Sequence, residues 1–160
     1  MEERVYELFN KLNITYEKVE HPSLFTCADH EKYGVHIGGL ECKNLFLRNR
    51  NKSNYYLVSL PAEKRTDLKE LQEKLQETKL SFGSEEDLME KLNIKTGAVS
   101  LLNIIGVEAT EVTFIIDDSL LKSEKVGFHP NVNTATLVFS PSEISRILDY
   151  YQVKYKFIVI

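Results

Sequence analysis

Apolar residues recur at helical spacing in four segments of the chain. These segments cover residues 2–12, 66–76, 84–93 and 140–151. In each of them the apolar positions fall on one face, which predicts amphipathic helices. Ser84 is the predicted N-cap of the third helix, and Ser140 that of the fourth, with Pro141 at its first position and Glu143 at its third.

Other segments are rich in β-branched and aromatic residues, which predicts strands. They are residues 15–21, 42–49, 54–61, 111–117, 134–140 and 154–160. The polar turn RNRNKS joins the second and third of them as a hairpin. Thr26 is predicted to cap a short helix that Gly34 ends, whereas the apolar segment KTGAVSLLNIIG follows no clear period.

Helices and strands alternate without strict βαβ regularity. This order predicts an α/β fold in which helices surround a mixed β-sheet. The length of 160 residues fits one domain, residues 1–160, with a sizeable core. A hydrophobic fraction of 42% and a charged fraction of 28% are typical of soluble globular proteins.

The net charge and the N-terminal sequence limit the classes of binding partner and the compartment that we expect. The formal net charge of −4 disfavours a DNA-binding protein, so contact with a polyanion requires a local basic patch. No apolar run approaches the roughly 20 residues of a membrane span, and the acidic N-terminus lacks a signal-peptide apolar region. We therefore expect a cytoplasmic protein, without membrane contact, whose cysteines are reduced thiols.

A metal site deserves consideration because five potential ligands lie between residues 21 and 42. They are His21, Cys27, His30, His36 and Cys42. Only Cys27 and His30 form a close pair, and no CxxC is present, so the spacing argues against zinc. The chain also lacks GxGxxG, GxxxxGK[ST] and GxSxG. We predict neither a metal nor a cofactor.

Lys43 stands next to the apolar run of the second predicted strand. Side chains alternate along a strand, so Lys43 shares one face with Leu45 and Leu47, whereas Cys42 and Asn44 lie on the other. A lysine at the rim of a core can extend its ammonium into water. It can equally line a cleft and bind an anion, and the pattern alone supports both interpretations.

Two loops carry candidate binding groups. His129, in a turn between strand-like segments, is either a solvated histidine or a group that orients a substrate or water. Gly97 is either a helix C-cap or part of a backbone surface, because the missing Cβ lets main-chain N–H groups approach a ligand. The hairpin turn that carries Arg48, Arg50 and Lys52 is either solvated or binds the phosphate backbone of a nucleic acid.

Six segments in a fixed order carry a resemblance to one family. They are HPSLFT (21–26), CKNLFLRNR (42–50), YYLVSLP (55–61), LSFGSEEDLMEKLNIKTGAVS (80–100), VTFIIDDSLL (112–121) and HPNVNTAT (129–136). Together they resemble the YbaK/ProX family of prolyl-tRNA editing deacylases, over nearly the whole chain. The second and fourth segments are more similar to the ProX branch.

This resemblance implies a mixed sheet around a small cleft and a free-standing enzyme that acts in trans. The implied reaction is hydrolysis of the ester between tRNA(Pro) and a wrong amino acid, with alanyl-tRNA(Pro) as the substrate. The implied partners are the aminoacylated acceptor end of tRNA and prolyl-tRNA synthetase. The family needs no metal and no protein nucleophile, because the ribose 2′-hydroxyl helps to position the water.

The resemblance also assigns residues to roles. Those implied for catalysis are Lys43, Gly97 and His129. Those implied for substrate binding are Asn44, Ala98, Val99 and Ser100. Those expected to bind tRNA are Arg48, Arg50 and Lys52. Lys43 would bind the ribose or terminal phosphate, backbone groups of residues 97–99 would hold the aminoacyl carbonyl, and His129 would shape the pocket.

The chain departs from the family in one loop. The family loop reads Gly-x-x-x-Pro, then an aromatic residue and, further on, Asn-Asp. Here Leu101 stands in place of the proline and Leu102 in place of the aromatic residue. The segment IGVE (105–108) stands in place of Asn-Asp. Leu101 leaves free a φ angle that proline would fix, which predicts a looser or differently aimed loop. An alternative function follows, a weakly catalytic sensor or adaptor that binds an amino acid or charged tRNA.

Overall fold

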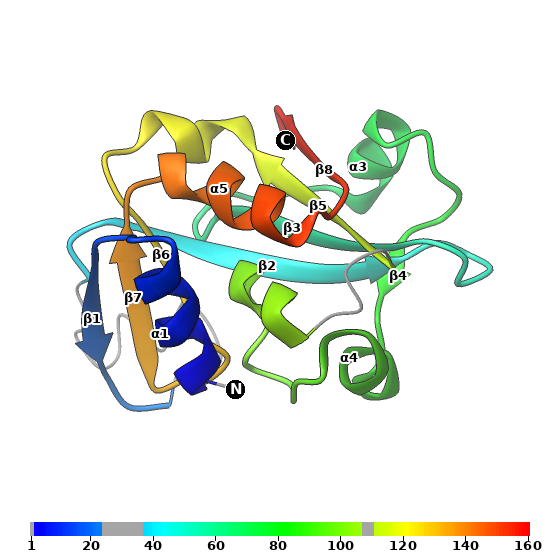
Figure 1. Cartoon of the computed structure of the whole chain (residues 1–160). Helices are drawn as coiled ribbons and strands as arrows, with labels where there is room; N and C mark the ends of the chain where they lie inside the picture. Colours follow the sequence, from blue (N-terminus) through cyan, green and yellow to red (C-terminus); the bar gives the residue numbers. More distant parts are fainter. Residues whose placement is uncertain (1, 24–36, 107–110) are drawn as a thin grey trace.

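The described strands form one mixed sheet (Figure 1). The structure is a computed structural model, and it describes residues 2–23, 37–106 and 111–160. The strands are β1 (Tyr16–Glu20), β2 (Leu40–Arg48), β3 (Tyr55–Pro61), β4 (Ser81–Phe82), β5 (Val112–Asp117), β6 (Val126–Phe128), β7 (Ala135–Phe139) and β8 (Tyr155–Ile158). Their order is β1-β7-β6-β2-β3-β5-β8, with β4 paired to β2. Parallel pairs join β2 to β6, β3 to β5 and β5 to β8, and the other pairs are antiparallel.

All four helices expected from the apolar periodicity form. They are α1 (Glu2–Lys11), α3 (Leu68–Lys74), α4 (Glu85–Leu92) and α5 (Ser142–Tyr151), with the 3₁₀ helices η1 (Leu101–Gly106) and η2 (Asp118–Lys122). Ser84 caps α4 as predicted. Its hydroxyl accepts from the Asp87 N–H at 3.1 Å, and the Asp87 carboxylate accepts from the Ser84 N–H at 2.9 Å. The α/β fold with a mixed sheet is therefore confirmed.

The predicted start of α5 is wrong by one residue. Pro141, not Ser140, occupies the N-cap position, with φ −62° and ψ −20°, and no side chain caps this helix end. The reason is that the Ser140 hydroxyl pairs with the Ser142 hydroxyl at 2.9 Å instead of accepting a backbone N–H. The predicted helix between Thr26 and Gly34 lies outside the described residues.

Two apolar clusters occupy the two faces of the sheet. The larger packs α1, α4, α5 and η1 against one face, and the smaller lies under α3 on the other (Figure 1). Along β2, Cys42 and Phe46 join the larger cluster, whereas Leu45 and Leu47 join the smaller. The predicted alternation is thus confirmed, and Lys43 lies on the same face of the sheet as α3.

The segment without a clear period is a turn followed by η1. Gly97 has φ +95°, a conformation that side chains with a Cβ rarely adopt. The chain then enters η1, where Leu101 and Leu102 are fully buried in the larger cluster. An apolar composition without amphipathic spacing therefore reflects a short helix that is enclosed on all sides.

Candidate functional site

The parallel ladder between β2 and β6 ends two residues before Lys43 on one strand and two residues before His129 on the other. Glu41 pairs with Gly127 in this ladder, and both chains continue by two residues to Lys43 and His129. Continuing the register sets these two residues at the same level of the sheet. Because side chains alternate, both lie on the face that Glu41 occupies. Two residues that are 86 positions apart in the sequence thus follow the last paired residues of two neighbouring strands.

His129 is held by backbone and ring contacts at the end of β6. Its Nδ1 lies 3.0 Å from the Ala135 carbonyl oxygen, which can only accept, so Nδ1 carries the hydrogen. The ring of His21 packs edge-on at 5.9 Å between centroids. His21 Nε2 in turn lies 2.9 Å from the Thr136 hydroxyl. The sequence suggested His21 only as a potential metal ligand and gave no sign of this pairing.

A small recess adjoins the two histidines. It is lined by Ile37, Glu41, Cys42, Gly127, His129 and Thr136. A Cβ at Gly127 would overlap the Ile37 side chain and approach Thr136 Cγ2 to 2.9 Å, so glycine keeps the recess open. Burial raises the pKa of the Cys42 thiol to about 12. Cys42 is therefore a protonated thiol and a poor nucleophile at neutral pH.

Lys43 is partly buried opposite Leu60 on β3. Within residues 2–23, 37–106 and 111–160, its ammonium makes no hydrogen bond or ion pair. The ammonium is thus available to an anion on the face that His129 shares. Its catalytic role stays a prediction.

Asn44, on the opposite face of β2, connects the sheet to the loop before η1. Its Oδ1 accepts from the Ser59 hydroxyl at 2.7 Å and from the Leu101 N–H at 3.1 Å. Ser59 is fully buried, and it pairs with Asn44 in the β2–β3 register. Asn44 therefore anchors the loop of residues 97–100, and its predicted contact with substrate is untested.

The loop of residues 97–100 is held by Asn103, which is fully buried. Asn103 Oδ1 accepts from the Ser100 N–H at 2.6 Å, and its Nδ2 donates to the Ala98 carbonyl at 3.1 Å and to Asn131 Oδ1. The Ser100 hydroxyl accepts from the Leu102 N–H at 3.2 Å. This reciprocal pattern resembles a capping box at the start of η1.

The backbone N–H groups of the loop differ in availability. The Ala98 N–H donates to the Lys95 carbonyl at 3.3 Å, which removes it from the predicted donors to an aminoacyl carbonyl. The N–H groups of Gly97 and Val99 make no hydrogen bond to any residue that the structure describes. These two are the candidate donors for a developing oxyanion.

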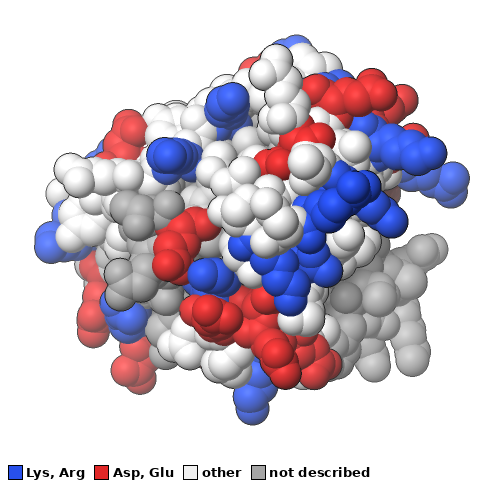
Figure 2. Space-filling model, turned by 90° about the vertical axis from the view of Figure 1, so that its right-hand side faces the viewer, with Lys and Arg blue, Asp and Glu red and all other residues white. Residues whose placement is uncertain are grey.

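The basic hairpin turn lies away from Lys43. Five residues separate Lys43 from Arg48 along β2, which corresponds to about 17 Å at roughly 3.3 Å per residue. The Arg48 guanidinium lies 3.9 Å from the Asp87 carboxylate, whereas Arg50 and Lys52 are exposed. Basic and acidic side chains adjoin on the face shown in Figure 2. Any tRNA contact here is therefore local, and it stays a prediction.

Three of the five potential metal ligands cannot be compared with the fold. Cys27, His30 and His36 lie outside the described residues. In the part of the chain that the structure describes, no three His, Cys, Asp or Glu residues are placed to hold a metal ion. No helix in the same ranges has the length and apolar character needed to cross a bilayer.

Comparison with known proteins gives matches over most of the chain. A family model described as the aminoacyl-tRNA editing domain matches residues 21–147. The prolyl-tRNA editing protein ProX of Acetoanaerobium sticklandii is 37% identical over 139 residues, which cover 87% of this chain and 85% of that protein. The mouse prolyl-tRNA synthetase associated domain-containing protein 1 is 35% identical over 136 residues, covering 82% and 80%.

The fold also has solved counterparts. The crystal structure of hypothetical protein APE2540 superposes with a TM-score of 0.73 and covers 96% of this chain and 97% of that chain, at 19% identity. At this identity the likeness concerns the fold alone. The span that matches the family model contains Lys43, Gly97 and His129.

Proposed function

The chain belongs to the aminoacyl-tRNA editing domain family, and from this membership we propose that it hydrolyses alanyl-tRNA(Pro) in trans. It is an aminoacyl-tRNA deacylase, a hydrolase of the ester that joins an amino acid to tRNA, and it edits mischarged tRNA(Pro). Alanine as the amino acid removed is the finer part of the proposal. We also propose that residues 1–160 act as one editing domain.

The need for such an enzyme follows from the physics of recognition. A synthetase pocket shaped for proline cannot strongly reject the smaller alanine, because the lost apolar contact is worth only about 1–3 kcal/mol. A second site that admits alanine and excludes proline completes a double sieve. The groove between the loop of residues 97–100 and the loop of residues 129–134, which Thr96, Ala98, Asn131, Asn133 and Thr134 line, supports a site of this kind.

The proposed mechanism uses main-chain donors and no covalent intermediate. A water attacks the ester carbonyl, and the N–H groups of Gly97 and Val99 stabilise the oxyanion. The carbon–oxygen bond to the ribose then breaks, the amino acid leaves as a carboxylate, and the ribose oxygen takes up a proton. Lys43 binds the ribose or terminal phosphate, and His129 shapes the wall of the pocket beside it.

The proposed partner is the acceptor end of charged tRNA. Exposed Arg50 and Lys52 can contact its phosphates at a distance from the reacting ester. Prolyl-tRNA synthetase, which is named in the description of the mouse relative, is a proposed second partner that would release the mischarged tRNA.

The observation that carries the proposal is the partly buried Lys43 on β2, whose ammonium is unpaired among the described residues. The test is deacylation of purified alanyl-tRNA(Pro) by the wild type and by Lys43→Ala, with Lys122→Ala as a control. Lys122 is on η2 and has a side chain that is 79% exposed. Loss of a charge-assisted contact of about 1.5–3 kcal/mol predicts a kcat/KM about 10- to 150-fold lower for Lys43→Ala.

The outcomes separate three readings. No hydrolysis by the wild type contradicts the proposed function. Full activity of Lys43→Ala contradicts only the role given to Lys43. Saturable binding of charged tRNA without turnover would instead indicate a sensor or adaptor.

A further inference from the structure

Asn103 and Asn131 join two loops that are distant in sequence. Asn103 belongs to η1, and Asn131 belongs to the loop between β6 and β7 that also carries His129. Asn103 Nδ2 donates to Asn131 Oδ1. Both residues are buried, with exposed fractions of 0% and 8%. This side-chain bond therefore connects the loop of residues 97–100 to the loop of residues 129–134 in the protein interior.

The orientation of both amides follows from their partners. Asn103 must present its oxygen to the Ser100 N–H and its nitrogen to the Ala98 carbonyl. Its remaining N–H then requires an acceptor, so Asn131 must turn its oxygen toward Asn103. The oxygen and both N–H groups of the Asn103 amide thus all have hydrogen-bond partners.

The same constraint leaves Asn131 Nδ2 without a partner. This nitrogen is buried and makes no hydrogen bond to any residue that the structure describes. A buried donor without an acceptor is destabilising, and Asn131 also has φ +64°, in the left-handed region. A glycine would tolerate the same φ angle and carry no unpaired nitrogen. Asn131 nevertheless provides the oxygen that accepts the hydrogen bond from Asn103, and glycine or leucine could not.

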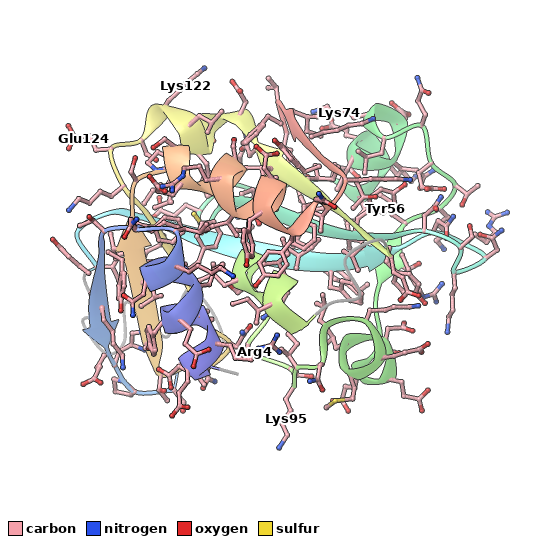
Figure 3. The ribbon with its side chains drawn as sticks, viewed as in Figure 1. Arg4, Tyr56, Lys74, Lys95, Lys122 and Glu124 are labelled. Atoms are coloured by element: carbon pink, nitrogen blue, oxygen red, sulfur yellow. The ribbon has the colours of Figure 1, made fainter. Side chains whose placement is uncertain are left out.

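The two loops face one another across a groove. Thr96 and Ala98 from the first loop line this groove, together with Asn131, Asn133 and Thr134 from the second. Lys95, at the border of the groove, points away from the protein (Figure 3). The bond between Asn103 and Asn131 therefore connects the two loops that form the walls of the groove, because Asn103 also holds Ala98.

The position of the first loop relative to the sheet is set by Asn44. Its Oδ1 accepts from the Leu101 N–H, a donor that a proline at this position could not supply. The loop is thus held at one end by Asn44 and at the other by Asn103. No proline ring fixes the φ angle at residue 101, so hydrogen bonds hold the backbone there instead.

We propose that Asn103 and Asn131 form a clasp that fixes the spacing between the 97–100 loop and the His129 loop, and thereby determines which amino acid the site accepts. The inference rests on the proposed function, because it concerns the same site. The candidate donors Gly97 and Val99 lie on one loop and His129 on the other. If the clasp opens, the loops separate and proline, which is larger than alanine, fits between them. Asn103 and Asn131 are positioning residues and need not touch the substrate.

The test compares Asn131→Gly, Asn103→Leu and the double variant with the wild type, using alanyl-tRNA(Pro) and prolyl-tRNA(Pro). Glycine removes the acceptor at position 131 and tolerates its positive φ angle. We expect each single variant to lower the ratio of the two kcat/KM values by about 10-fold or more, the order that one methylene contributes to discrimination. The double variant should lower it no further than either single variant, because both changes open the same clasp.

Leu71→Ala is the control for general destabilisation. Leu71 is the buried residue of α3, and it belongs to the smaller apolar cluster on the other face of the sheet. This variant is expected to lower the melting temperature and leave the ratio unchanged. Clasp variants that keep the wild-type ratio would overturn the proposal, and so would a ratio that falls equally in Leu71→Ala.

A second readout does not depend on activity. The Ser100 N–H bonds to Asn103, so its hydrogen exchange should be faster in both single variants, while the Leu57 amide in the central strand β3 stays protected. Unchanged exchange at Ser100 in Asn131→Gly would overturn the clasp. If the wild type hydrolyses neither ester, the proposed function fails, and exchange alone decides whether the clasp positions the loop.

Discussion

The carboxylate of Glu77 fixes the hairpin turn that carries Arg50 and Lys52. Replacing Glu77 should lower the free energy of unfolding by an amount that depends on pH. Glu77 accepts from the Tyr56 hydroxyl, from Asn54 Nδ2 at 3.0 Å and from Asn49 Nδ2 at 3.1 Å. Its oxygen also accepts from the Thr78 N–H at 2.9 Å. Tyr56, labelled in Figure 3, lies on β3 near α3.

These hydrogen bonds stabilise the ionised form of Glu77. Burial alone would raise its pKa, but the bonds from Tyr56, the Thr78 backbone, Asn54 and Asn49 outweigh burial and lower the pKa from 4.5 to about 2. A difference of about 2.5 in pKa corresponds to about 3 kcal/mol of stability, at 1.36 kcal/mol for each pKa unit. Because the turn is partly exposed, solvent screening reduces this to about 1–2 kcal/mol.

The sign of the pH dependence follows from the lowered pKa. The stabilisation is fully present above the pKa of the unfolded chain, 4.5, and it is lost as the pH falls toward about 2. Glu77→Gln should therefore lower the free energy of unfolding by about 1–2 kcal/mol at pH 7. The difference from the wild type should shrink to less than half by about pH 3.

Urea unfolding of both proteins at pH 7 and at about pH 3 measures this difference. Glu70→Gln, on the exposed side of α3, is the control and should cost little at either pH. A difference between the wild type and Glu77→Gln that is the same at both pH values would refute the reasoning. It would show that Glu77 acts through its shape and not through its charge.

Two further predictions concern the loop before η1 and the hairpin turn. Leu101→Pro removes the N–H that bonds to Asn44 and part of a fully buried side chain, so thermal unfolding should show a loss of more than about 1 kcal/mol. No gain in deacylation is expected, and a gain in activity would contradict the structural role given to this bond. Arg50→Ala should lower the slope of log Kd for tRNA against log salt concentration by about 0.7–0.9. Lys122→Ala is the matched control, and an unchanged slope for Arg50→Ala would remove the phosphate contact from the proposal.

Local pattern was sufficient to predict much of the fold. Helical periodicity located the four helices, and strand alternation placed Lys43 on the face of Leu45 and Leu47, because these patterns depend only on neighbouring residues. The start of α5 was wrong by one residue because a serine hydroxyl has several possible partners. The pairing of the Ser140 and Ser142 hydroxyls depends on backbone geometry that the sequence does not display.

The candidate site was predicted less completely. Lys43, Gly97 and His129 came from a resemblance, and their roles stay predictions. Asn103 and Asn131 were missed because their bond joins positions 28 residues apart, and a buried amide pair has no local pattern. His21 was considered only as a metal ligand, whereas strand pairing places it against His129. Such contacts depend on tertiary register, which composition and spacing do not determine.

The most direct test of the central claim is a deacylation assay of the wild-type protein on alanyl-tRNA(Pro) and prolyl-tRNA(Pro), with alanyl-tRNA(Ala) in parallel. The account predicts rapid release of alanine from tRNA(Pro) and prolyl-tRNA(Pro) that stays charged. Equal hydrolysis of alanyl-tRNA(Pro) and prolyl-tRNA(Pro), or none of either, would contradict it.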